Sequence, residues 1–239
     1  MKTRPVNIAG RELSTLLRGE TKTISTWSES WSAQRFALHV AVIILGVGFY
    51  GAAMGWWRDP QQALFVAIKF PLIILLTTMG NALINAMLAP LLGLNIPFRQ
   101  SVSAILISFT IASAILGAFS PLVAFMVWNV PDMAAKNLSG STYNLILQAH
   151  VLVIALAGVT GNMRLFQLLA QLGGSRTVAL RVQCASLAGN LFLGSQLSWI
   201  LRPFIGSPTL PVEFFRKAAL RGNFFEAVFN SLKQIFQFN

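Results

Sequence analysis

Two histidines, His39 and His150, are the side chains of this sequence best suited to hold a metal-containing cofactor. Paired membrane histidines can ligate a haem, and a single imidazole suits a chlorin-type pigment. His39 lies about one turn inside the first long apolar segment, and His150 about two turns inside the fourth, from the opposite surface. Their depths therefore differ by roughly 10 Å, which is too much for one haem pair. We expect no cofactor, and leave a pigment on either histidine as an alternative.

The seven acidic residues all lie outside the apolar segments. Carboxylates within a membrane usually carry the protons and cations of pumps and coupled transporters, so their absence there argues against coupled transport. It also argues against carboxylate metal sites and glycosidase carboxylate pairs. Gly-x-Ser-x-Gly, His-Glu-x-x-His, Walker A and dinucleotide-binding motifs are absent as well. The lone Cys184 lies in an apolar run and is expected to be buried. We therefore predict a protein that is not an enzyme.

Neutral polar residues inside the apolar segments are expected to join helices through hydrogen bonds. They are Asn81, Asn85, Gln148, Asn162 and Asn190. The alternative is that four of them (Asn81, Gln148, Asn162 and Asn190) line a path for a solute. Lys69 is expected to extend its amine toward the membrane surface. Close helix packing is predicted at three pairs of small residues four apart: Gly51 and Gly55, Ser113 and Gly117, Ala185 and Gly189.

The composition indicates which elements position these residues. The chain has 239 residues, 55% of them hydrophobic and only 10% charged, with a net charge of +11. Soluble domains carry about 25% charged residues. The basic residues are scattered between apolar runs, which argues against nucleic-acid binding. A helix needs about 20 apolar residues to cross a membrane. We therefore predict an all-α, polytopic integral membrane protein with five transmembrane helices, at about 35–57, 61–86, 101–128, 143–166 and 177–201.

The distribution of basic residues predicts the orientation. Residues 1–34 form a basic arm that we place in the cytoplasm as a flexible segment, and the membrane is the inner membrane if the source is bacterial. Trp57, Trp128 and Trp199 then end spans on the outer side, where interfacial tryptophans are favoured. The basic residues after position 201 contradict the positive-inside rule, because a five-span chain places them on the outer side.

A weak internal repeat relates residues 61–128 to residues 143–201. A loop arginine is followed 18 residues later by a glycine in both, at Arg99 and Gly117 and again at Arg176 and Gly194. Both units run in the same direction, which predicts a parallel pair of helical hairpins within a transmembrane domain at 35–201.

Residues 202–239 form a phenylalanine-rich C-terminal arm. Asn223 is placed to cap a helix whose apolar residues fall on one stripe, which predicts an interfacial amphipathic helix. The arm meets either lipid or a partner subunit. Its candidate interface residues are Arg202, Phe214, Phe215, Arg216, Phe224, Phe225, Phe229 and Phe236.

The five-span layout over residues 35–201, with the passage Pro97-Phe98-Arg99-Gln100-Ser101 entering a middle span, resembles the Yip1-like family. This resemblance implies a non-enzymatic membrane scaffold or adaptor. We predict a scaffold or a subunit of a larger membrane complex, whose partners are the lipid bilayer, other membrane subunits or a second copy of the chain. The alternatives are a small-solute channel or uncoupled transporter, and a pigment-carrying subunit.

Overall fold

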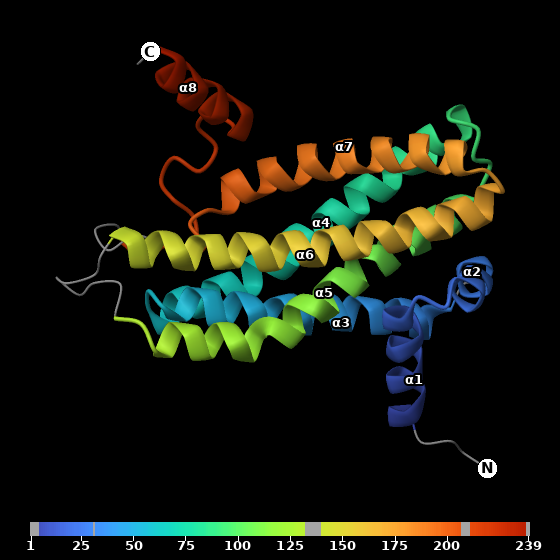
Figure 1. The fold of residues 1–239 in the computed structure, drawn as a ribbon, viewed down its shortest axis with the longest axis horizontal. Helices are drawn as coiled ribbons and strands as arrows, with labels where there is room; N and C mark the ends of the chain where they lie inside the picture. Colours follow the sequence, from blue (N-terminus) through green and yellow to red (C-terminus); the bar gives the residue numbers. More distant parts are fainter. Residues whose placement is uncertain (1–4, 31, 132–139, 207–210, 238–239) are drawn as a thin grey trace.

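The computed structural model describes residues 5–30, 32–131, 140–206 and 211–237, and within those ranges it contains helices and no strand (Figure 1). The all-α fold class is therefore confirmed for this part of the chain. Its helices are α1 (Pro5–Arg18), α2 (Thr21–Glu29), α3 (Ala33–Trp56), α4 (Pro60–Leu91), α5 (Phe98–Trp128), α6 (Gly140–Gly173), α7 (Arg176–Leu201) and α8 (Phe224–Gln237).

Helices α3 to α7 lie lengthwise beside one another as an antiparallel bundle (Figure 1). Helix α3 packs on both α4 and α5, α6 packs on α5 and α7, and α7 also packs on α4. The two N-terminal helices lie at the end of the bundle where α3 begins. Helix α8 lies at the opposite end, beyond the last turn of α7.

Four helices of the described chain are long and apolar enough to cross a membrane: α3, α4, α5 and residues Ser141–Gly173 of α6. This finding indicates an integral membrane protein. By this criterion of length and apolarity, the predicted number of five spans is one too high for the described residues. The fifth predicted span does form a helix, α7, but Arg181, Gln183 and Asn190 make it less apolar than the others.

The outer surface of the bundle is apolar along the candidate spans. Phe49, Met87 and Leu152 are 63%, 74% and 70% exposed. Large apolar surfaces of this kind are rare on soluble monomers, and they suit contact with lipid chains. The interior holds two apolar clusters, one around Leu16 beside the N-terminal helices and one around Tyr50 toward the other end.

Small residues allow close approaches between helices, and each predicted pair supplies one such glycine. A Cβ added to Gly51 would lie 2.7 Å from the carbonyl oxygen of Val66 on α4, and one added to Gly117 would lie 2.8 Å from the backbone of α3. A Cβ on Gly189 would lie 2.6 Å from Oδ1 of Asn81. Larger side chains at these positions would push the helices apart.

The described residues of the N-terminal arm are helical and packed, in contrast to the flexible segment expected from the sequence. Leu16 of α1 and Ile24 of α2 are 1% and 4% exposed and share an apolar cluster with Leu168 of α6. The burial of these two side chains holds the arm against the bundle. The cytoplasmic location of this end stays a prediction.

Candidate functional site

A group of hydrogen-bonded polar side chains joins α4 to α7 inside the bundle. Asn81 Nδ2 donates to Ser186 Oγ at 2.9 Å and to Asn190 Oδ1 at 2.7 Å. Asn85 Nδ2 donates to Asn81 Oδ1 at 2.8 Å. Asn81 is fully buried. The structure thus brings three of the predicted polar residues together, with their amides bonded to one another across a helix pair.

A second polar contact joins α6 to α7. Gln183 Nε2 donates to Asn162 Oδ1 at 2.9 Å. Gln148, in contrast, is exposed on α6 and belongs to neither group. Gln183 and Ser186 were not among the predicted residues, although their spacing from Asn190 places all three on one face of a helix. This spacing is the signal in the sequence that could have identified Gln183 and Ser186.

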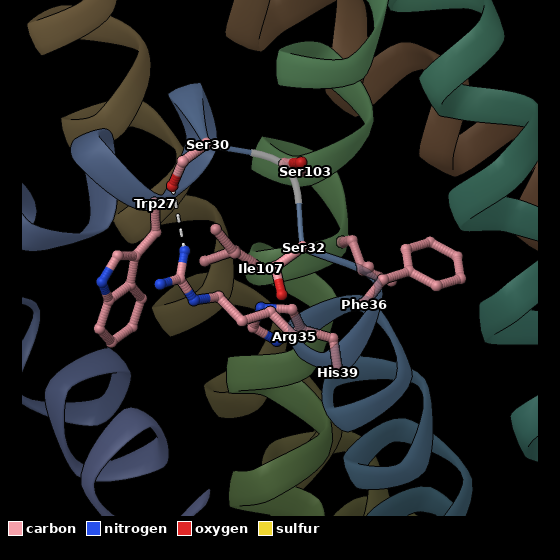
Figure 2. Close-up of a pocket in the computed structure, with 9 residues that line it drawn as sticks. Trp27, Ser30, Ser32, Arg35, Phe36, His39, Ser103 and Ile107 are labelled. Atoms are coloured by element: carbon pink, nitrogen blue, oxygen red, sulfur yellow. Dashed lines mark hydrogen bonds between the residues drawn. The ribbon is translucent and has the colours of Figure 1, made fainter. Parts of the chain in front are cut away.

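The two histidines lie in separate places. His150 Nδ1 of α6 lies 3.0 Å from the hydroxyl of Tyr50 on α3, and both side chains are buried. His39 instead lines a small hollow with Trp27 and Arg35, at the start of α3 (Figure 2). Tyr50 is eleven residues beyond His39, or about 16 Å along the helix, so the histidines do not face one cofactor. Within the described ranges, no group of three or more His, Cys, Asp or Glu side chains is placed to hold a metal ion.

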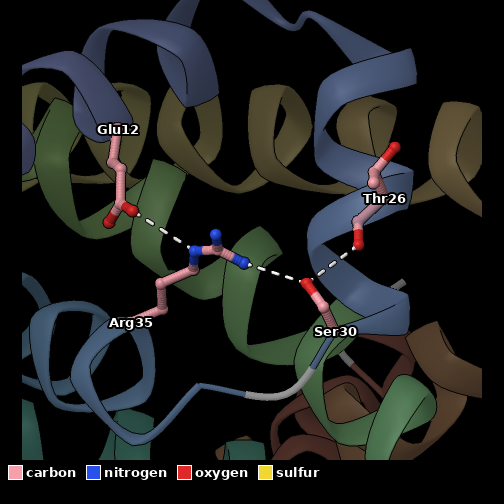
Figure 3. Close-up of polar contacts among 4 residues, drawn as sticks. All are labelled: Glu12, Thr26, Ser30 and Arg35. Atoms are coloured by element: carbon pink, nitrogen blue, oxygen red, sulfur yellow. Dashed lines mark hydrogen bonds and ion pairs between the residues drawn. The ribbon is translucent and has the colours of Figure 1, made fainter.

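Arg35 connects the N-terminal helices to the start of α3. Its Nε donates to Glu12 Oε1 at 3.2 Å, and its Nη1 donates to Ser30 Oγ at 3.2 Å (Figure 3). Ser30 in turn donates to the carbonyl of Thr26. The guanidinium also lies 5.2 Å from the ring centre of Trp27. The positive charge of Arg35 is therefore paired with the carboxylate of Glu12 inside the protein.

The chain after α7 is fastened to α4 by two buried polar side chains. Lys69 Nζ donates to the carbonyl of Pro203 at 3.3 Å and to that of Glu213 at 3.5 Å, and it lies 5.1 Å from the ring centre of Phe214. Gln62 Nε2 donates to the carbonyls of Pro203 and the next residue at 3.0 and 2.9 Å. The amine of Lys69 is therefore buried beneath the C-terminal segment, and its position relative to the membrane surface stays a prediction.

The predicted C-terminal interface residues divide into packed and exposed groups. Phe214 packs edge-on against Phe65 of α4, with ring centres 5.4 Å apart, so it belongs to the anchor of the arm. Phe225 stacks on Phe192 of α7, with ring centres 5.8 Å apart. The side chain of Phe236 lies outside the described residues. Four of the predicted aromatic side chains, Phe225 included, are still 38–57% exposed, and we refer to them together as the aromatic face: Phe215, Phe224, Phe225 and Phe229.

Helix α8 begins as its sequence predicts. The backbone N–H of Glu226 donates to Asn223 Oδ1 at 2.8 Å, which is an N-terminal cap. The start of the helix is therefore fixed by its own sequence, and α7 contacts it through the Phe192–Phe225 pair.

The two predicted arginines of the arm lie near each other where the chain leaves α7. The guanidinium of Arg202 lies over the ring of Trp199. Burial and the nearby positive charge of Arg216 hold the pKa of Arg202 below its usual value. The charged form of Arg202 is therefore disfavoured at this place.

No family model, curated protein or solved structure matches this chain. The Yip1-like resemblance and the parallel hairpin repeat therefore stay predictions.

Proposed function

We propose that the protein is a non-enzymatic membrane scaffold, or a subunit of a larger membrane complex, that binds other membrane proteins through its C-terminal arm. The observation that carries this proposal is the aromatic face, exposed at the end of a segment that Lys69 and Gln62 anchor to α4. Exposed aromatic side chains are favoured anchors at protein interfaces. An anchored arm also loses less conformational freedom when it binds.

The rival function, a small-solute channel or uncoupled transporter, is less well supported. It needs the amides of α4, α6 and α7 to face a solute. Asn81 is instead 0% exposed and bonded to Asn190, and Asn162 is bonded to Gln183. Side chains that satisfy one another serve helix packing.

The proposal includes α7 as a fifth membrane-crossing helix. Its 26 residues have a length of about 39 Å, which is enough to cross the hydrocarbon core. It lies beside two candidate spans, α4 and α6 (Figure 1). Its polar residues Gln183 and Asn190 bond to those neighbours, so they need not meet lipid. The two terminal arms would then lie on opposite sides of the membrane.

The test is purification from the native source in a mild detergent, comparing the full chain with one that ends at Gly222. The shortened chain keeps Phe214 and the Lys69 anchor but lacks α8. We expect stoichiometric membrane partners with the full chain and their loss without α8. A matched control, E226Q/N230Q, changes exposed polar residues of α8 and should keep the partners.

The same sample tests the alternatives. Solute flux through proteoliposomes of the purified protein alone, abolished by Asn81→Leu, would overturn the scaffold proposal in favour of a channel. A visible absorption band lost on changing His150 or His39 would favour a pigment-carrying subunit.

A further inference from the structure

Two guanidinium groups, those of Arg202 and Arg216, belong to segments that meet after α7, because Lys69 binds the carbonyls of both Pro203 and Glu213. The Nε atoms of Arg202 and Arg216 are both buried and have no hydrogen-bond partner among the described residues. Neither side chain forms an ion pair with a residue of the described chain. Partly desolvated like charges are costly unless an anion binds both. This is the arrangement of an anion site.

We infer that Arg202 and Arg216 form a binding site for a phosphate group, supplied by an anionic phospholipid headgroup or by free phosphate. Guanidinium donors match the oxygens of a phosphate group and bind them in pairs. A phosphate between the two arginines would satisfy both buried Nε atoms and relieve the repulsion. The inference does not depend on the proposed scaffold role, but its lipid form rests on the proposal that α7 crosses the membrane.

The surroundings place this site at the depth of lipid headgroups. Arg202 directly follows α7, and its guanidinium lies over Trp199. The Trp199 indole N–H donates to the carbonyl of Arg221 at 3.4 Å, which ties the following segment to the same turn of α7. Tryptophan and arginine are both favoured where a helix leaves the hydrocarbon core.

An apolar cavity lined by chain neighbours of Arg202 favours the lipid as the source of the phosphate. Ser198 and Phe204, on either side of Arg202 in the chain, line a cavity of about 360 Å³ together with Phe70 of α4 and Ile154 of α6. The lining is almost wholly apolar. An acyl chain can occupy such a cavity while its phosphate meets Arg202, whereas a free phosphate ion gains nothing from it.

The test measures binding to the purified full-length protein in neutral detergent micelles. The probes are phosphatidylglycerol and phosphatidylcholine with brominated acyl chains, read by quenching of tryptophan fluorescence, and inorganic phosphate, read by calorimetry. We expect phosphatidylglycerol to bind about tenfold more tightly than phosphatidylcholine, as charge-assisted hydrogen bonds allow. The variant R202Q/R216Q should lose this preference. The control K217Q/R221Q removes the same charge from neighbouring exposed positions and should keep it.

The outcomes separate the two sources of phosphate. Binding of phosphatidylglycerol that inorganic phosphate does not displace supports the lipid. Binding of inorganic phosphate itself, lost in R202Q/R216Q, supports the free ion at the same site. Equal phosphatidylglycerol affinity in wild type and R202Q/R216Q, or equal losses in both double variants, would overturn the inference. If the glutamine variant does not fold, R202K/R216K, which keeps charge but not paired donors, must show weakened binding.

Discussion

Lys69 Nζ lies 3.3 Å from the carbonyl oxygen of Pro203, so a lysine inside a candidate membrane span is bound by the main chain that follows α7. A charged amine in hydrocarbon is costly and is usually found with polar partners. Here the partners are carbonyls of the C-terminal segment. The contact joins the second candidate span to the arm that we propose binds a partner.

Replacing Lys69 with Met is expected to loosen the chain after α7, because it removes the donors and keeps most of the apolar stem. A hydrogen bond from a charged donor contributes about 1.5–3 kcal/mol, and the free energy of unfolding should fall by about that amount. Trypsin should then cleave faster at Lys217. Lys233→Met, at an exposed position on α8, serves as the control, and an unchanged cleavage rate in K69M would show that Lys69 does not anchor the arm.

The hydrogen bond between Asn81 and Asn190 is expected to stabilise the packing of α4 on α7. In a double-mutant cycle of N81A and N190A, the coupling energy should be about 0.6–1.7 kcal/mol, the range for interhelical pairs in membranes. Unfolding in mixed micelles measures it. The same cycle with N81A and Gln148→Ala should give no coupling, since Gln148 is exposed on α6. Equal coupling in both cycles would contradict the assigned contact.

Gly51→Ala is expected to destabilise the packing of α3 on α4, because the added Cβ would lie 2.7 Å from the Val66 carbonyl oxygen. Overpacking of this kind costs about 1–3 kcal/mol. Gly158→Ala of α6 is the matched control, since an added Cβ there meets nothing within 4 Å. Alanine favours helix over glycine, so G158A should be neutral or slightly stabilising. Thermal unfolding measures this difference in stability between G51A and G158A. Similar unfolding midpoints for the two variants would contradict the prediction.

The side of the membrane on which each terminus lies distinguishes four spans from five. If α7 crosses the membrane, reporters fused to the N-terminus and the C-terminus should report opposite sides, with the basic N-terminal arm in the cytoplasm. The lone Cys184 of α7 should react slowly with a membrane-impermeant maleimide until detergent is added. Both reporters on one side, with rapid labelling of Cys184 in intact vesicles, would show that α7 does not cross.

The long helices could be predicted from sequence because the length and apolarity of a segment are local properties. Each predicted span forms a helix, with the largest difference at α6, which continues beyond the predicted end at 166 to Gly173. The cap of α8 by Asn223 was predictable for the same reason. Gly51, Gly117 and Gly189, one from each predicted pair of small residues, also lie where a neighbouring helix approaches closely.

The contacts between distant segments could not be predicted from local patterns. The partner of Lys69 lies 134 residues away, and a lysine near a span end was reasonably expected to reach the membrane surface. Leu16 and Ile24 are buried only because helices distant in sequence, α5 and α6 among them, supply their neighbours. Cys184 lies in an apolar run and was expected to be buried, yet it is exposed on α7.

The most direct test of the proposed scaffold function is the native mass of the particle purified in mild detergent, for wild type and for F225A/F229A. These changes remove two side chains of the aromatic face and leave the Lys69 anchor intact. The account predicts that wild type carries at least one other membrane protein in fixed stoichiometry, that F225A/F229A loses it, and that E226Q/N230Q retains it. A wild-type particle without a partner, or a partner retained equally by F225A/F229A, would contradict the account.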